Sequence, residues 1–262
     1  FQFHSVAIQH WLHVASEAGC ETGVQLLIDH NASVNVESEH FATALQAAST
    51  YGHDRVVKLL LREGADADIH SNRFATALQA ASANGHEKSV WLLLSHNAQV
   101  NAQGGKLATA LQAASARGHG NIVQMLLDKG ADANARSTGY HSALQLVSLR
   151  SHESIVDLLL NHDALVDAQD RWSATALQIA SSKGHSRIVE LLLAGGADVD
   201  ARSDLFGTSL QIASAKGHLD VVRLLLGWEA DVGRQGGGHA TALQLAMFYG
   251  HEDIVRILSR LY

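Results

Sequence analysis

Apolar and polar positions follow a fixed order along the chain, in which two short apolar runs and a polar stretch repeat. The stretch ATALQAASANGH, residues 75–86, returns with few changes as ATALQAASTYGH, ATALQAASARGH and ATALQIASSKGH. The hydroxyl residue that opens each copy recurs every 33 residues without insertion or deletion, at Thr43, Thr76, Thr109, Ser142, Thr175, Thr208 and Thr241. A weaker copy, HWLHVASEAGC, keeps this phase from His10, so the pattern predicts eight repeats.

Each repeat is predicted to contain two short helices. The opening Thr or Ser is a favoured N-cap, because its hydroxyl accepts from free backbone amides, and ALQAAS supplies good helix formers after it. Glycine ends this first helix nine residues after the cap, at Gly52, Gly85, Gly118, Gly184, Gly217 and Gly250. A second apolar run follows at once, as in DRVVKLLLREG from Asp54 to Gly64, and the polar remainder predicts a loop.

The second helix is expected to end at a residue that accepts the left-handed conformation. Four repeats have Gly or Asn there, at Gly64, Asn97, Gly130 and Gly196. Asp163 and Glu229 replace them in two others, so we expect strained helix ends at both. Because helices of about nine residues are marginal alone, stacking of repeats must supply the stability.

These features resemble the ankyrin repeat, a 33-residue unit with an opening T-x-L, a mid-unit G-H and a late L-L-L-x-x-G-A-D. The resemblance covers residues 10–262 and implies an all-α ankyrin-repeat solenoid of eight helix-turn-helix units with loop or hairpin tips. It implies a single array over residues 1–262, with a degenerate N-terminal repeat and a C-terminal repeat at its ends. The expected repeats span residues 8–37, 41–70, 74–103, 107–136, 140–169, 173–202, 206–235 and 239–262.

The first four residues of the motif differ from the family pattern at two positions. The family's T-P-L-H reads TALQ here, and the chain contains no proline. Ala is also a good helix former at this position, and Gln46 and its equivalents can both donate and accept, so they can bridge adjacent repeats. The TALQAAS spelling further resembles the arrays of large fungal multidomain proteins of the NACHT or STAND type, where the array follows a nucleotide-binding switch domain.

Composition narrows the classes of function. The formal charge of −7 disfavours general nucleic-acid binding, which needs a basic face. The apolar runs are shorter than the roughly 20 residues that cross a bilayer, and the start of the chain lacks secretion-signal features. We therefore expect no membrane partner and an intracellular, cytoplasmic location. Cys20 is the only cysteine, which excludes an intrachain disulfide, and a start at Phe1 suggests part of a longer protein.

Motifs of catalytic chemistry are absent from the sequence, including phosphate loops, zinc helices and nucleophile elbows. We expect no enzymatic activity and no cofactor. Seven histidines share the place after the helix-ending residue, at His53, His86, His119, His152, His185, His218 and His251. Stacked helices lie about 8 to 10 Å apart, whereas zinc needs nitrogens about 2 Å away. We therefore interpret these histidines as turn residues that bond nearby backbone, and expect no metal.

Positions that vary between repeats are candidates for partner contact. Eight residues after the cap, at the solvent end of the first helix, four consecutive repeats are basic, at Arg117, Arg150, Lys183 and Lys216. Tyr51 and Tyr249 occupy the same position elsewhere. At about 10 Å per repeat the basic residues form a column roughly 30 Å long, which predicts an acidic ligand. The alternative is a solvated face without a partner, because isolated surface charges contribute little.

A second variable group lies in the loop tips before the caps. Its candidates are Arg73, Phe74, Tyr140, Trp172, Leu205 and Phe206. Exposed aromatic residues are typical of interface cores. The alternative is that these rings pack between neighbouring loops.

The leading hypothesis is a monomeric, non-catalytic interaction module that binds a protein or peptide on its concave face. One alternative is a ligand-sensing or autoinhibitory domain of a larger nucleotide-dependent switch protein. The other is a structural spacer or an engineered near-consensus array, which the regularity of the repeats would suit.

Overall fold

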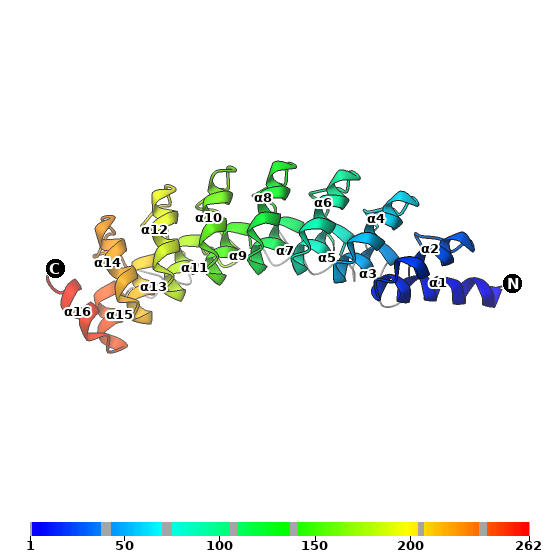
Figure 1. The fold of residues 1–262 in the computed structure, drawn as a ribbon. Coiled ribbons are helices and arrows are strands. Elements are labelled where there is room, and N and C mark those ends of the chain that lie inside the picture. Colours follow the sequence, from blue (N-terminus) through cyan, green and yellow to red (C-terminus); the bar gives the residue numbers. More distant parts are fainter. Residues whose placement is uncertain are drawn as a thin grey trace. The chain divides into compact units, whose positions relative to one another are not determined.

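The computed structural model describes residues 2–37, 43–69, 75–104, 109–136, 141–203, 207–235 and 240–261, with side chains from residue 7 onward. These residues form sixteen helices in consecutive helix-turn-helix pairs (Figure 1). Within the same ranges, strand-type pairing is limited to an isolated bridge between Ser203 and Gly207. The predicted all-α architecture of helix pairs is confirmed. The chain divides into two compact modules, the N-terminal module of residues 1–138 and the C-terminal module of residues 139–262.

The N-terminal module contains two rows of helices. The first-helix row consists of α1 (Gln2–Glu17), α3 (Ala44–Tyr51), α5 (Ala77–Asn84) and α7 (Ala110–Arg117). The second-helix row consists of α2 (Glu21–Asp29), α4 (Asp54–Arg62), α6 (Glu87–Ser95) and α8 (Gly120–Asp128).

The C-terminal module has the same arrangement. Its first-helix row consists of α9 (Ala143–Arg150), α11 (Ala176–Lys183), α13 (Ser209–Lys216) and α15 (Ala242–Phe248). Its second-helix row consists of α10 (Glu153–Leu160), α12 (Ser186–Ala194), α14 (Leu219–Gly227) and α16 (Glu252–Leu258). The core includes the buried apolar side chains of both rows, among them Leu45, Leu93, Ile188 and Leu225.

Helix α1 is longer than the other helices. It begins at Gln2, whereas the sequence phase places the first copy of the motif at His10. His10 is a poor N-cap, and no glycine or proline interrupts the sixteen residues of α1, so the helix continues through this position.

First helices from α3 onward all begin with a capping box. The Thr or Ser side chain accepts from the backbone N–H three residues later, and the glutamine there accepts in return from the cap residue's N–H. In α11 these bonds are 3.3 Å from Gln178 N to Thr175 Oγ1 and 2.9 Å from Thr175 N to Gln178 Oε1. The predicted N-caps are confirmed. The glutamine's part in the cap was not predicted, although T-x-x-Q is the sequence signature of a capping box.

The same glutamines connect neighbouring repeats. Gln178 is 1% exposed, and its Nε2 donates to the carbonyl oxygens of Ala201 at 3.1 Å and Gly207 at 2.7 Å. Gln145 and Gln211 make equivalent pairs of bonds. The predicted bridging role is confirmed, because one amide closes the cap of its own helix and also holds the loop that leads to the next repeat.

Left-handed residues end the helices where the sequence predicts them. The glycines after the first helices have φ from 72° at Gly52 to 79° at Gly118. Asp163 and Glu229 have φ of 59° and 61°, so both non-glycine ends adopt the expected conformation. It costs a non-glycine residue about 1 kcal/mol.

Five of the histidines that follow a turn glycine bond to the preceding repeat. His218 Nε2 donates to the carbonyl oxygen of Ser182 at 3.2 Å, and His251 Nε2 to that of Ala215 at 3.1 Å. His53, His86 and His119 make the same contact in the N-terminal module. The predicted bond to backbone is therefore present, but it reaches the neighbouring repeat instead of staying within the turn.

A serine six residues after each cap is fully buried. Its copies are Ser49, Ser82, Ser115, Ser148, Ser181 and Ser214. Ser148 donates to the carbonyl oxygen of Leu144 at 2.8 Å, whereas the other five hydroxyls find no partner within the described structure. A buried polar group without a partner costs about 1 to 3 kcal/mol, so this position is a recurrent weakness in the core.

Leu126 tests the packing of the core. It is fully buried in α8, so Leu126→Ala should lower the free energy of unfolding by about 2 to 5 kcal/mol, measured by urea denaturation. Leu26→Ala is the control, because Leu26 is 59% exposed and its truncation should cost less than about 0.5 kcal/mol. A loss below about 1 kcal/mol for Leu126→Ala would contradict a core position.

Gln178→Met tests the glutamine bridge. Met has a similar length and helix propensity, but the buried Thr175 amide and the Ala201 and Gly207 carbonyls would lose their partner. We expect unfolding free energy to fall by more than about 2 kcal/mol. Gln244→Met is the matched control, because Gln244 is exposed and its hydrogen bonds in the described structure are those of the cap. Equal losses in the two variants would show that the bridge is not stabilising.

Candidate functional site

The predicted basic column lies at the ends of the first helices. In the C-terminal module, Arg150, Lys183 and Lys216 are the last residues of α9, α11 and α13, and all three side chains are exposed. No carboxylate among the described residues forms an ion pair with them. Arg117 holds the same place at the end of α7 in the N-terminal module. The structure therefore brings three of the four basic candidates together on neighbouring helices of one module.

Part of this placement has a structural explanation. A cation in the last turn of a helix interacts favourably with the partial negative charge of the helix C-terminus, an effect worth about 0.3 to 1 kcal/mol at the surface. A cation is not needed for these helices to form, because α3 and α5 end at the same position with the uncharged residues Tyr51 and Asn84. The helix C-terminus therefore does not by itself account for three cations on neighbouring helices.

An apolar stripe runs beside the basic residues in the C-terminal module. Four residues after the cap, the first helices carry half-buried apolar side chains, at Leu146, Ile179, Ile212 and Leu245. In the N-terminal module the same position is alanine, at Ala47, Ala80 and Ala113. Sequence reasoning missed this stripe, although the change from alanine to larger apolar residues is visible in the repeats.

The stripe and the basic residues meet in a hollow between α11 and α13. The hollow has a volume of about 450 Å³ and is lined by Gln178, Ile179, Ser182, Lys183, Ile212 and Lys216. Two isoleucines supply apolar surface, and two lysines stand beside it. We call the surface formed by Leu146, Arg150, Ile179, Lys183, Ile212 and Lys216 the first-helix face. It can receive an apolar side chain and, next to it, anionic groups.

The two tyrosine candidates have partners within their own modules. Tyr51 is 48% exposed, and its hydroxyl donates to Glu17 Oε1 at 3.2 Å. This hydrogen bond, with smaller contributions from burial and from the Glu17 charge, raises the pKa of Tyr51. Tyr249 is 57% exposed and stacks on the ring of His251 with centroids 6.5 Å apart. About half of each side chain is therefore exposed.

Trp172 is the tip candidate that lies in the described chain. Its backbone N–H donates to Asp170 Oδ1 at 2.8 Å, and its carbonyl accepts from Ser203 Oγ at 3.0 Å, so the tip is held from two sides. The Arg171 guanidinium lies 3.9 Å from the ring centroid, and the ring of His141 lies at 5.8 Å. The indole is still 37% exposed. It therefore both packs within the tip and presents surface.

The other tip candidates lie outside the described residues. They are Arg73, Phe74, Tyr140, Leu205 and Phe206.

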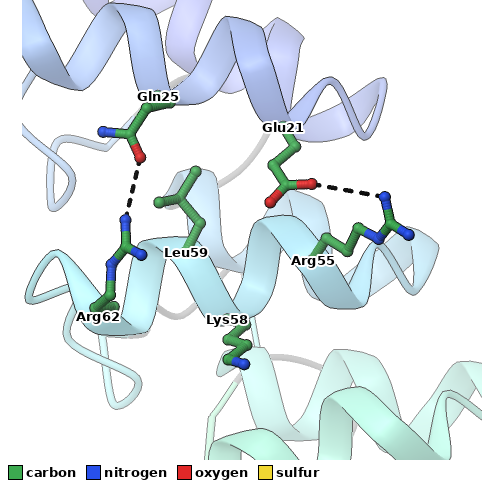
Figure 2. A pocket seen from close by; sticks show the side chains of 6 residues that line it. All are labelled: Glu21, Gln25, Arg55, Lys58, Leu59 and Arg62. Atoms are coloured by element: carbon green, nitrogen blue, oxygen red, sulfur yellow. Dashed lines mark hydrogen bonds and ion pairs between the residues drawn. The ribbon is translucent and has the colours of Figure 1, made fainter.

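A second hollow, of about 370 Å³, lies between α2 and α4 in the second-helix row of the N-terminal module (Figure 2). Arg55 pairs with Glu21 at 3.9 Å, and Arg62 bonds Gln25 Oε1 at 3.1 Å and Glu63 at 3.0 Å. Lys58 points away from Glu21 and Gln25 (Figure 2). Because both arginines already have partners, this hollow is a weaker candidate than the one between α11 and α13.

Other classes of site have no counterpart in the described chain. No group of three or more His, Cys, Asp or Glu side chains is placed to hold a metal ion within the described ranges. In those same ranges, no helix combines the length and apolarity that a bilayer span requires.

Comparison with known proteins identifies the repeat. A family model of three consecutive ankyrin repeats matches four overlapping stretches, residues 12–104, 45–137, 110–203 and 202–261. No curated protein matches the chain. The finer resemblance to arrays of fungal multidomain proteins stays a prediction. Since the matched stretches span nearly the whole chain and every matched stretch is built of the helix pairs described above, the protein belongs to the ankyrin repeat family.

Proposed function

We propose that the C-terminal module binds a protein or peptide partner along its first-helix face. Ankyrin repeats are generally modules of protein–protein interaction and typically carry no catalysis. The observation that supports this face is the hollow between α11 and α13, where Ile179 and Ile212 lie beside the unpaired Lys183 and Lys216. An apolar side chain of the partner enters the hollow while its acidic groups meet the lysines and Arg150.

The spacing of the basic residues defines the partner's chemistry. Neighbouring first helices lie about 10 Å apart. Acidic residues match this spacing at every third position of an extended peptide of the polyproline II type, which has three residues per turn and rises about 3.1 Å per residue. In a helix they match it at about every seventh position, since the rise is about 1.5 Å per residue. The partner is thus an acidic segment with apolar residues between its acids.

Apolar and charged contacts have different roles in this binding. Burial of apolar side chains against Leu146, Ile179, Ile212 and Leu245 supplies affinity, at about 25 cal/mol per Å² of apolar surface removed from water. The unpaired cations raise the association rate and reject basic segments. Because the chain as a whole has a net charge of −7, an acidic partner is attracted to this basic row although the rest of the chain is acidic on balance.

The proposed contact extends beyond the hollow. Tyr249 continues the column at the end of α15, and Trp172 presents a held aromatic ring from its tip. The remaining candidates for contact are Tyr51, Arg117, Arg73, Phe74, Tyr140, Leu205 and Phe206.

Charge reversal tests the basic row. The probes are fluorescent peptides with glutamates at every third position or at every seventh position and leucines between them, and binding is followed by fluorescence anisotropy. We expect the parent protein to bind one of the two, and Lys183→Glu with Lys216→Glu to weaken binding by more than about tenfold. Arg187→Glu with Arg223→Glu is the control, because these exposed arginines lie in the second-helix row. Equal weakening by both pairs would show that only net charge matters.

Truncation tests the apolar stripe. Ile179→Ala and Ile212→Ala install the residue that α3, α5 and α7 carry at this position. The two changes together should weaken binding of the same peptide about tenfold or more, because each truncation removes about 1 kcal/mol of apolar contact. Leu191→Ala with Leu224→Ala is the matched control in the second-helix row, where both leucines are also half-buried. Unchanged affinity in the isoleucine variants would place the ligand elsewhere.

A further inference from the structure

The hollow between α11 and α13 places two cations beside two apolar side chains. Ile179 and Ile212 are half-buried, whereas Lys183 and Lys216 are exposed. On each helix the lysine follows the isoleucine by four residues, which is about one turn and a rise of about 6 Å. Both lysines are therefore displaced from the apolar pair in the same direction and by the same amount.

This combination depends on residues that differ between the repeats. The half-buried Ser182 forms part of the wall of the hollow, and its hydroxyl donates to the carbonyl oxygen of Ile179 at 2.8 Å. At the same place α9 carries the larger Leu149, and Tyr249 follows α15 where α13 ends in Lys216. Among the described first helices of the C-terminal module, α11 and α13 are therefore the neighbours that combine a small wall residue with a cation on both helices.

A single anionic group above the hollow can contact both lysines. Packed helices lie about 8 to 10 Å apart, and each ammonium stands on a flexible four-carbon stem, so the two charges can approach one point. Lys183 and Lys216 form no ion pair with a carboxylate of the described chain. A phosphate monoester suits two such cations, because it carries a charge of about −1.5 to −2 at pH 7 and three acceptor oxygens.

We propose that the partner of the first-helix face places a phosphotyrosine side chain in this hollow. The inference rests on the proposed function, and it identifies one apolar group and one anionic group of the partner as parts of a single side chain. The ring lies between Ile179 and Ile212, and the phosphate beyond the far edge of the ring meets Lys183 and Lys216. Phosphorylation of the partner therefore controls its binding.

Other side chains match only part of the hollow. Leucine and phenylalanine fill its apolar part and leave both lysines without a partner. Aspartate and glutamate carry one charge on a short stem, and phosphoserine holds its phosphate close to the backbone, so these residues bury little apolar surface against the isoleucines. Phosphotyrosine has a ring between its backbone and its phosphate. That ring buries a large apolar area and loses little conformational freedom, because few of its bonds rotate.

Peptide substitution tests the proposal. Each of the two glutamate–leucine peptides described above receives phosphotyrosine, tyrosine, phenylalanine or phosphoserine in place of its central leucine, and binding is followed by fluorescence anisotropy. In the peptide whose spacing fits the face, we expect phosphotyrosine to bind about tenfold or more tightly than tyrosine, because the phosphate adds charge-assisted contacts with the lysines. It should exceed phosphoserine by a similar factor of about ten, because only the ring removes apolar surface from water.

Charge removal in the protein locates the phosphate. Lys183→Gln with Lys216→Gln keeps the side-chain length close to that of lysine and should abolish the advantage of phosphotyrosine over tyrosine. Arg187→Gln with Arg223→Gln is the matched control, because these exposed arginines lie in the second-helix row of the same module. The control variant should keep the full advantage of phosphotyrosine.

Filling the hollow locates the ring. Ser182→Leu installs the residue that α9 carries at this place and should weaken binding of the phosphotyrosine peptide about tenfold or more, because the new side chain occupies the space of the ring. Ala215→Leu is the matched control on α13, since Ala215 holds the equivalent position and does not line the hollow. Circular dichroism confirms that both variants keep their helices.

Three results would overturn the proposal. The first is equal affinity of the phosphotyrosine and tyrosine peptides, and the second is equal affinity of the phosphotyrosine and phosphoserine peptides, which would show that the anion is bound without the ring. The third is free phenyl phosphate that binds as tightly as the phosphotyrosine peptide, which would make a small aryl phosphate the ligand. Binding of the glutamate–leucine peptides with no gain from phosphotyrosine contradicts this inference alone, whereas no binding by any peptide contradicts the proposed function as well.

Discussion

A buried side-chain amide is the interaction on which each repeat depends. The glutamine three residues after the cap, such as Gln178, lies among apolar neighbours where an unpaired amide would be costly. It avoids this cost by accepting from its own cap and by donating to two carbonyls of the loop that follows. A single amide therefore fixes the start of one helix relative to the entry of the next repeat. An inserted or deleted residue between Thr175 and Gly207 would break that relation, which accounts for repeats of constant length.

Histidine links the repeats in the opposite direction. Glutamine reaches forward along the chain to the next loop, whereas His218 reaches back 36 residues to the end of the preceding first helix. The glutamine near the start of each first helix and the histidine after its end both bond to adjacent segments. The residues that recur in every repeat therefore serve the stacking of the repeats. Partner contact is then left to positions free to differ, and the clearest difference between the modules is the change from Ala113 to Leu146, Ile179 and Ile212.

The helix caps and helix ends could be predicted from the sequence because each depends on residues that are close along the chain. Thr175 as a cap and the left-handed ends at Gly184, Asp163 and Glu229 follow from backbone sterics and helix termini alone. The partners of His218 could not be predicted, since a bond across 36 residues depends on how repeats stack. The long α1 was missed because periodicity set its start where no stop signal exists. The hollow between α11 and α13 combines two helices, so only the stacked structure shows that Ile179 and Lys216 share it.

The buried serines have a mechanical consequence. The hydroxyls of Ser181 and Ser214 are buried without a partner in the described structure, so a local opening that admits water satisfies a group that the closed core does not. Such a repeat resists opening less than one with an apolar side chain of the same shape would. Because stability in a solenoid is close to a sum over neighbouring repeats, this softness is distributed along a module instead of being confined to one hinge. We therefore expect a module of such repeats to behave as an elastic element that yields slightly at several repeats at once under a pulling force.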